Sequence, residues 1–497
     1  MSFRGFNSVK LTAFANDLDG LARHSNKLHT DVASLLTTVQ QQLPPGETAS
    51  RDPGLQDLVG DLIPAAFFGR SRLPGSLCQE LGDMQASIKR RIKQLDGMHK
   101  FQDAGYPVDS SMLFLDEKAP DGKKVDEALN RLKGLNGKDF GVNGNRDDLT
   151  KVSKSLDGLT AAELDTVITK ADPQDLARFN KLANNTDDSG WSPFDANGLP
   201  EAERRDSFSL MLSKIGPENM DKFMKAFPGV QPTFTNTDAY EEHGNSQNGQ
   251  TNSGIHWQKP SDPLFNGDVS ADEINQRQFG DCWYVASLAA VTQKNPQFIK
   301  DGIKQNPNGT VSVRIWDKEG NHHWVTVTPD LPTDTNGSPI GTYGNGTTWP
   351  AYYEKAFAAA YSDDDDGERG YGGIEGDDPK DSAPYLTGHE GEDITKSGGF
   401  LGLDTEEDKS LSSLKKAYDA GQPVTVSTPD DDKLEKNVPK QWGSCYSTNH
   451  AYYVRGFTND GKVILGNPWG ASQYPPITVD QEQFNKYFQM PEKYKAP

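Results

Sequence analysis

Apolar residues near the start of the chain recur at alternating spacings of three and four, the pattern of an amphipathic helix that packs on a helical partner. This first stripe, interrupted only by Ser25, comprises Leu11, Phe14, Leu18, Leu21, Leu28, Val32, Leu35 and Val39. After Pro44-Pro45-Gly46, Ser76 and Gln79 have the spacing of a capping box. A second stripe follows, made of Leu77, Leu81, Met84, Ile88, Ile92 and Leu95. Residues 1–100 are therefore predicted to form an α-helical hairpin.

Shorter helical patterns follow between residues 118 and 228, where Thr160 and Glu163 again have capping-box spacing. Since no catalytic residues stand out in this stretch, it is predicted to be a small all-α domain. From residue 229 the composition shifts toward Asn, Gln, Gly, Ser, Thr and Glu, with few apolar residues. Residues 229–262 are therefore predicted to be a flexible linker.

A polar, glycine-containing turn runs into a small-residue apolar helix at residues 276–290, with Cys282 at the first helical position. Free backbone N–H groups and the positive end of the helix dipole favour a thiolate there. We therefore expect the pKa of Cys282 to lie below its free value of about 8.5. Gln276 is placed to present its side-chain amide beside the sulfur as an oxyanion donor. The alternative is a structural cysteine buried in a core helix.

Of the nine histidines, only His450 lies in a context suited to activating a thiol. Residues 449–457 have a strand pattern, Thr458-Asn459-Asp460-Gly461 is typical of a hairpin turn, and residues 462–466 form the returning strand. Antiparallel pairing about this turn places His450 near Asn467. The Asn467 carbonyl can then accept a hydrogen bond from one ring nitrogen of His450 and leave the other facing the sulfur. The alternative is an ordinary hairpin with a surface histidine.

Composition narrows the class of protein. A length of 497 residues suggests three domains, and a net charge of −21 argues against nucleic acid or an anionic membrane as partner. No apolar run is long enough to span a bilayer, and the first residues lack the apolar region of a secretory signal. Cytoplasmic synthesis is expected, with export by a route without a cleaved signal left open. Three cysteines, Cys78, Cys282 and Cys445, do not make a disulfide framework.

Three motifs occur in an order that resembles the catalytic core of the calpain cysteine proteases. They are Gln276-x-x-x-Gly280-Asp281-Cys282-Trp283, Asn449-His450-Ala451-Tyr452 and Gly466-Asn467-Pro468-Trp469-Gly470. The resemblance covers roughly residues 265 to 492 and includes Trp349 with the Glu354-Lys355-Ala356 segment. It suggests a bacterial-type enzyme with the catalytic core only, joined to an unrelated helical N-terminal half. The membrane-binding and EF-hand modules of the animal enzymes are expected to be absent.

The resemblance implies an α+β fold in which an all-α N-terminal region precedes a papain-like protease domain at residues 263–497. One lobe of that domain would be helical and start at Cys282, and the other would be β-rich and carry His450 and Asn467. Cys282 would be the nucleophile, His450 the general base and acid, Asn467 the group that orients His450, and Gln276 the oxyanion donor. Trp469 would shield the His450–Asn467 bond from water. The implied reaction is hydrolysis of peptide bonds in protein substrates through a thioester.

Two departures from the family pattern bear on calcium. Family members activated by calcium have acidic residues at places where this chain has Thr347 and Ala471-Ser472, which offer no carboxylate. The acidic run at residues 363–366, with Glu368, Glu375, Asp377 and Asp378 nearby, is another place for a cation, although such runs are more often solvated. The thiol chemistry requires no metal. No cofactor is therefore expected, and a role for calcium stays open.

Two other classes of function remain as alternatives. A catalytically silent or autoinhibited binding module usually loses one of its site residues, whereas this chain keeps Gln276, Cys282, His450 and Asn467. A transglutaminase-like acyl transferase generally has Asp at the third position, where this chain has Asn467. An exported effector or toxin is a further hypothesis that rests on the N-terminal helices. These resemble the helical hairpins exported by type VII secretion, without their Trp-x-Gly turn, and would bind a partner protein or the secretion machinery.

Overall fold

The computed structural model describes residues 16, 120–135, 146–184, 198–216, 219–234, 237, 239, 254–361, 370–395 and 407–495. The predicted hairpin of residues 1–100, apart from residue 16, lies outside the described residues. So do Cys78 and the acidic run at residues 363–366. No helix in the described ranges is both long enough and apolar enough to cross a membrane.

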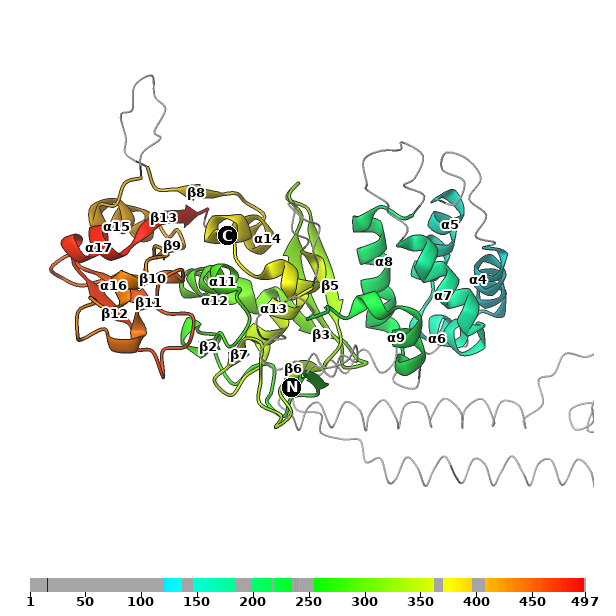
Figure 1. Ribbon diagram of the computed structural model, residues 1–497. Helices are drawn as coiled ribbons and strands as arrows, with labels where there is room; N and C mark the ends of the chain where they lie inside the picture. Colours follow the sequence, from blue (N-terminus) through cyan, green and yellow to red (C-terminus); the bar gives the residue numbers. More distant parts are fainter. Residues whose placement is uncertain are drawn as a thin grey trace, which may run out of the picture. The chain divides into compact units, whose positions relative to one another are not determined.

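The described residues between 120 and 234 form helices around a common apolar core. The elements are α4 (Gly122–Gly134), α5 (Arg146–Asp157), α6 (Ala161–Lys170), α7 (Pro173–Ala183), α8 (Glu201–Lys214), α9 (Met220–Ala226) and η3 (Pro228–Val230) (Figure 1). The predicted capping box at Thr160 and Glu163 begins α6, with Thr160 N donating to Glu163 Oε2 at 2.9 Å.

A helical lobe, as we call residues 254–387, follows. Its helices are α11 (Cys282–Lys294), α12 (Pro296–Asp301), α13 (Trp349–Ala360) and α14 (Pro379–Thr387), with the short turns η4 (Ala271–Glu273) and η5 (Gly372–Ile374). Its antiparallel sheet is β3 (Ile303–Gln305), β4 (Val311–Trp316) and β5 (His322–Val327). Two small pairs complete it, β1 (His256–Gln258) with β6 (Leu331–Thr333) and β2 (Ile274–Asn275) with β7 (Tyr343–Gly344). The strand β5 packs against α8, where Thr326 N donates to Ser209 Oγ at 3.1 Å.

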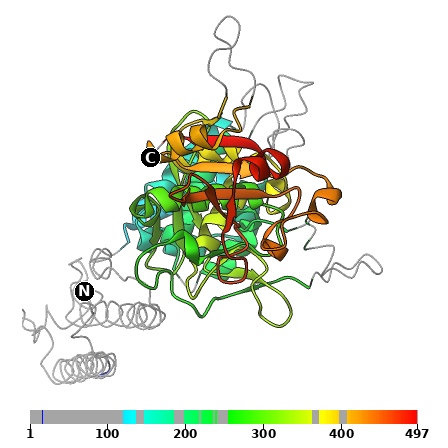
Figure 2. The ribbon, with the colours of Figure 1, turned by 90° about the vertical axis from the view of Figure 1, so that its left-hand side faces the viewer.

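A β-rich lobe, residues 391–494, completes the described chain and is nearest the viewer in Figure 2. Its sheet has the order β12-β11-β10-β9-β13-β8. The strands are β8 (Gly391–Asp393), β9 (Val424–Ser427), β10 (Ala451–Phe457), β11 (Val463–Gly466), β12 (Ile477–Val479) and β13 (Gln489–Tyr494). The helices are α15 (Leu411–Asp419), α16 (Asp432–Glu435), η7 (Gly443–Cys445) and α17 (Gln481–Tyr487).

The strand β10 lies between the two cores. Tyr452 and Val454 are buried in the core of the β-rich lobe, whereas Tyr453 is buried in the core of the helical lobe. This alternation follows from the period of two along a strand, which sends successive side chains to opposite faces. The helix α11 packs against β10, as Figure 1 shows. The start of α11 and the start of β10 are thereby brought together.

The folded region begins earlier in the chain than the sequence pattern predicts. Residues 256–258, which we assigned to the flexible linker, form β1 and pair with β6, with His256 opposite Thr333 and Gln258 opposite Leu331. The error has a physical cause, because the partner strand lies about seventy residues further along the chain. A three-residue strand has too little hydrophobic periodicity of its own to be recognised.

Candidate active site

Cys282 is the first residue of α11, as the turn-to-helix pattern predicted. The helix is buried from Trp283 to Thr292 because it is built of small and aromatic apolar residues. Trp283 Nε1 donates to the carbonyl of Ile374 at 2.7 Å, and the Tyr284 ring stacks on Phe357 with 4.0 Å between centroids. These contacts fix the start of the helix and therefore the position of the sulfur.

The hairpin formed by β10 and β11 has the predicted register. Phe457 pairs with Val463 and Gly456 with Ile464, and the chain reverses at Gly461, whose φ is 82°. An irregularity between Val454 and Gly456 shifts the pairing by one residue on the side of the histidine. Beyond the last pair, His450 Nε2 lies 3.0 Å from Asn467 Oδ1. The structure therefore brings these two side chains together, as the hairpin predicts.

The amide of Asn467 is held so firmly that it fixes the tautomer of His450. Asn467 Oδ1 accepts from the backbone N–H of Trp469 at 2.9 Å, and Asn467 Nδ2 donates to the carbonyl of Cys445 at 3.2 Å. The atom that faces His450 Nε2 is thus the amide oxygen, which can only accept. Nε2 must then carry the hydrogen, which leaves Nδ1 as the basic nitrogen of the neutral ring. Neither of these two backbone contacts was predicted from the sequence.

An indole ring covers the histidine–asparagine bond. The rings of Trp469 and His450 are 4.4 Å apart between centroids and tilted by 35°. His450 exposes 6% of its surface and Asn467 exposes 4%. The hydrogen bond between them therefore lies in an environment of low polarity, where an electrostatic interaction is stronger than in water.

The backbone around His450 is also constrained. Asn449 has a φ of 47°, in the left-handed region that Asn tolerates better than most residues. His450 N donates to Thr428 Oγ1 at 3.0 Å, and Thr428 N donates to the carbonyl of His450 at 2.9 Å. Thr428, which directly follows β9, was not predicted from the sequence to have this role. A hydroxyl residue at the end of that strand was the available signal.

The two lobes meet at the site through short backbone contacts. The backbone N–H of Ala451, the residue after His450, lies close enough to the Cys282 sulfur to act to lower the pKa of the thiol. Gln276 N donates to the carbonyl of Pro468 at 2.8 Å. Gly470 has a φ of 109°, and a Cβ built on it would overlap Asn275 Oδ1. The segments around residues 276 and 468 are thereby locked against each other.

Replacing Gly470 with alanine should lower the free energy of unfolding by about 2–4 kcal/mol, because backbone strain adds to a steric overlap. The measurement is a urea unfolding curve. Gly461→Ala is the matched control, since Gly461 has a similar positive φ of 82° but no atom within 4 Å of a built Cβ. Gly461→Ala should therefore lose only the free energy of unfolding that the backbone strain costs. If both variants lose the same free energy of unfolding, the Asn275 side chain can move away from the new methyl group at little energetic cost.

The ionisation of the candidate nucleophile differs from the sequence-based prediction. Burial raises the pKa of Cys282 to about 11, although the backbone N–H groups of Ala451 and Trp283 act to lower it. Burial also lowers the pKa of His450 to about 4, against the effect of the Asn467 hydrogen bond. The expected pKa below 8.5 is therefore wrong for this structure, because loss of water outweighs the helix start. At neutral pH the two groups rest as a thiol and a neutral imidazole.

Gln276 is buried beside the start of α11, but its amide is already engaged. Gln276 Nε2 donates to the carbonyl of Phe279 at 2.9 Å and to Asp281 Oδ1 at 3.1 Å. Both amide hydrogens are thus used within the turn that leads to Cys282. An oxyanion would have to replace one of these acceptors.

Some of the residues considered for calcium binding lie in the described ranges. Thr347 is fully buried, with Gly344 N donating to its carbonyl at 3.0 Å. Glu375 Oε1 accepts from Gly280 N at 3.0 Å, and Asp377 Oδ2 accepts from the Tyr361 hydroxyl at 3.1 Å. Within the described ranges, no three or more His, Cys, Asp or Glu side chains form a group that could hold a metal ion.

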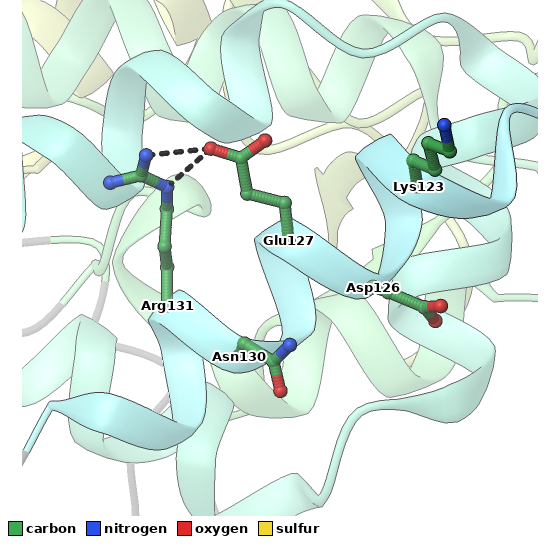
Figure 3. Close-up of a pocket in the computed structure, with 5 residues that line it drawn as sticks. All are labelled: Lys123, Asp126, Glu127, Asn130 and Arg131. Carbon is green, nitrogen blue, oxygen red and sulfur yellow. Dashed lines mark hydrogen bonds and ion pairs between the residues drawn. The ribbon is translucent and has the colours of Figure 1, made fainter.

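A shallow hollow of about 550 Å³ lies elsewhere, on the polar face of α4 (Figure 3). It is lined by Lys123, Asp126, Glu127, Asn130 and Arg131. Glu127 and Arg131 form an exposed ion pair one helical turn apart. The hollow contains none of the candidate site residues, and we assign it no function.

Comparisons with known proteins agree with the geometry of this site. Residues 228–492, just over half of the chain, match the family described as calpain family cysteine protease. The chain is 25% identical to "Calpain-type cysteine protease DEK1" of Arabidopsis thaliana over 216 residues, which are 41% of this chain and 9% of that protein. It is 25% identical to "Calpain clp-4" of Caenorhabditis elegans, covering 44% of this chain and 30% of that protein. It is 27% identical to "Calpain-13" of Rattus norvegicus, covering 44% and 33%. The match thus spans a third or less of each of these three relatives.

Proposed function

Because the chain belongs to the calpain family of cysteine proteases, we propose that it is a cysteine endopeptidase that cleaves protein substrates with Cys282, His450 and Asn467. Its α+β lobes agree with the papain-like fold expected from the sequence. One observation carries the assignment of roles. The fixed amide of Asn467 leaves Nδ1 of His450 as the free base, and the next residue, Ala451, directs a backbone N–H that acts to lower the pKa of Cys282.

In the proposed reaction, the Cys282 thiol gives its proton to His450 Nδ1 as the sulfur attacks the peptide carbonyl. The imidazolium that forms is stabilised by the Asn467 carbonyl through Nε2–H, in the sheltered environment under Trp469. His450 then protonates the departing amine, which leaves a thioester on Cys282. His450 next takes a proton from water, and the resulting attack on the thioester releases the acid and restores the thiol.

Because the thiol and the imidazole are both neutral before the reaction, the first proton transfer must create two charges. Transfer of the proton creates two opposite charges in a buried place, which is favourable only if they form together and lie close to each other. Attack on the carbonyl moves the negative charge from sulfur to oxygen. We propose that the oxyanion then takes hydrogen bonds from the Cys282 backbone N–H and from Gln276 Nε2, released from the Phe279 carbonyl or from Asp281.

We further propose that the reaction needs no metal, because each proton transfer has an assigned donor and acceptor among side chains and water. The test is digestion of casein by the purified chain with added calcium and with excess chelator. A thiol-directed epoxide is added in parallel, and the labelled peptide is identified by mass spectrometry. We expect cleavage under both conditions, inhibition by the epoxide, and labelling at Cys282.

Each of the other outcomes of this test would contradict a different part of the proposal. Cleavage that stops with chelator would overturn the metal-free proposal and leave the thiol chemistry in place. Cleavage that resists the epoxide would exclude Cys282 as the nucleophile. Absence of both cleavage and labelling would favour the silent or autoinhibited binding module. Formation of isopeptide bonds between casein chains without cleavage would favour the acyl transferase.

A further inference from the structure

Two buried carboxyl groups lie beside the candidate nucleophile and are not used by the proposed reaction. Asp281 directly precedes Cys282 and has no exposed surface, and Glu354 of α13 exposes only 1%. Neither forms an ion pair with any residue that the structure describes. The neighbouring Lys355 is directed elsewhere, since its Nζ donates to the Thr328 hydroxyl at 2.7 Å and to the Asp330 carbonyl.

The hydrogen bonds around the pair leave one oxygen of each carboxyl unmatched. Glu354 Oε1 accepts from Thr342 N at 2.7 Å, and Asp281 Oδ1 accepts from Gln276 Nε2 at 3.1 Å. Asp281 Oδ2 and Glu354 Oε2 are buried and receive no hydrogen bond from any other group in the described ranges. The two carboxyl groups are nevertheless close enough for the negative charge of Glu354 to raise the pKa of Asp281. Ionised carboxylates can only accept, so a bond between them requires a proton.

We propose that Asp281 and Glu354 share one proton, held mainly by Asp281, and that this pair positions Gln276 and keeps negative charge away from the Cys282 sulfur. A single proton supplies the missing donor for both unmatched oxygens. Burial raises the pKa of each group, well above the usual range for Asp281 and to about 7 for Glu354. We place the proton on Asp281 because Glu375, whose Oε1 accepts from Gly280 N, adds negative charge next to Asp281 and disfavours its ionisation. The single negative charge of the pair then resides on Glu354, in another helix.

This inference rests on the proposed function and adds two positioning residues to it. Neutral Asp281 still accepts from Gln276 Nε2 through Oδ1, which fixes the amide beside the start of α11. An ionised Asp281 acts to raise the pKa of the adjacent Cys282, because a negative charge disfavours a neighbouring thiolate, and a neutral Asp281 does not have this effect. The shared proton thus lets an acid stand next to the nucleophile without opposing its ionisation.

The other titratable groups near the pair come from α11, from the segment around η5 and from the β-rich lobe. Burial raises the pKa values of Tyr284 on α11 and Tyr371 before η5 well above 10, so both hydroxyls stay neutral. Glu375 accepts from Gly280 N and adds to the negative potential at Asp281. From the β-rich lobe, Tyr452 interacts with Cys282 and stays neutral, because burial raises its pKa well above the usual range. Burial lowers the pKa of His450 to about 4.

The test measures alkylation of Cys282 by iodoacetamide as a function of pH, read by mass spectrometry on the peptide that contains Cys282. In Glu354→Gln, the new amide donates to Asp281, which can then ionise beside the sulfur. The alkylation profile should move to higher pH by about one unit. In Asp281→Asn, the new side chain keeps an oxygen for Gln276 and a donor for Glu354, and so imitates the protonated acid. Its profile should stay within about 0.3 units of the unchanged chain, a small fraction of the shift that a neighbouring charge produces.

Two results would overturn the proposal. One is an unshifted profile for Glu354→Gln in a variant whose thermal unfolding shows that it is folded. The other is a profile for Asp281→Asn that moves to lower pH, which would mean that Asp281 carries the charge in the unchanged chain. The second result decides the question even if Glu354→Gln does not fold. Casein cleavage by the unchanged chain is measured in parallel, because its absence would count against the proposed protease and not against the shared proton.

Discussion

Replacing Cys282 with alanine should abolish casein cleavage, with a loss in kcat/KM of at least about 10⁴-fold, because removal of a nucleophile leaves only binding and oxyanion stabilisation. The substitution removes one sulfur from a half-buried position at the start of α11 and should leave the fold intact. The measurement is the initial rate of casein digestion, with circular dichroism to confirm folding.

Cys445→Ala is the matched control for that experiment, since Cys445 is the other free cysteine among the described residues. Its carbonyl accepts from Asn467 Nδ2, and this backbone contact survives the substitution. We expect at least half of the cleavage rate to remain, because the Cys445 thiol has no assigned part in the reaction. Cleavage that survives in Cys282→Ala, or that disappears in Cys445→Ala, would mean that the nucleophile has been assigned to the wrong residue.

Replacing His450 with alanine should lower kcat/KM by about 10³-fold or more, within the range that general acid–base catalysis contributes. The effect should be large because burial keeps the Cys282 thiol protonated at neutral pH, so the reaction depends on a base that accepts the proton during attack. Asn467→Ala should have a smaller effect, since it leaves the imidazole in place and removes only its fixed orientation. Steady-state kinetics on a fluorogenic peptide would measure both.

The same comparison can contradict the proposed roles. If Asn467→Ala costs as much as His450→Ala, orientation and tautomer control the reaction as strongly as the base itself. If His450→Ala retains most of its activity, another base acts, and the bond between Nε2 and Asn467 is only structural. Recovery of the rate of His450→Ala with added imidazole would support the role of His450 as base.

Local patterns predicted those parts of the site in which the partners are close in sequence. The meeting of His450 with Asn467 follows from one turn, Thr458-Asn459-Asp460-Gly461, and from the alternation of the strands on either side. The position of Cys282 at a helix start follows from the change from a polar turn to small apolar residues. Such features can be predicted from the sequence because the backbone conformation of a few consecutive residues determines them.

Properties that depend on distant segments could not be predicted in this way. The direction of the Cys282 pKa shift depends on how much water the folded chain excludes from the thiol, and a helix start alone gives the opposite sign. Asp281 meets Glu354 across more than seventy residues of chain, and β1 meets β6 across a similar distance. In the motif at residues 276–283, Asp281 looked like part of a polar turn. Nothing in the sequence marked it as half of a buried acid pair.

The strand β10 contributes Tyr453 to one core and Tyr452 and Val454 to the other. Two domains joined by a linker can melt one after the other, because each keeps its own interior when the other is lost. Here, unfolding of either lobe would expose one face of β10 to water. The core of the other lobe depends on the same strand. We therefore expect the two lobes to unfold as a single cooperative unit.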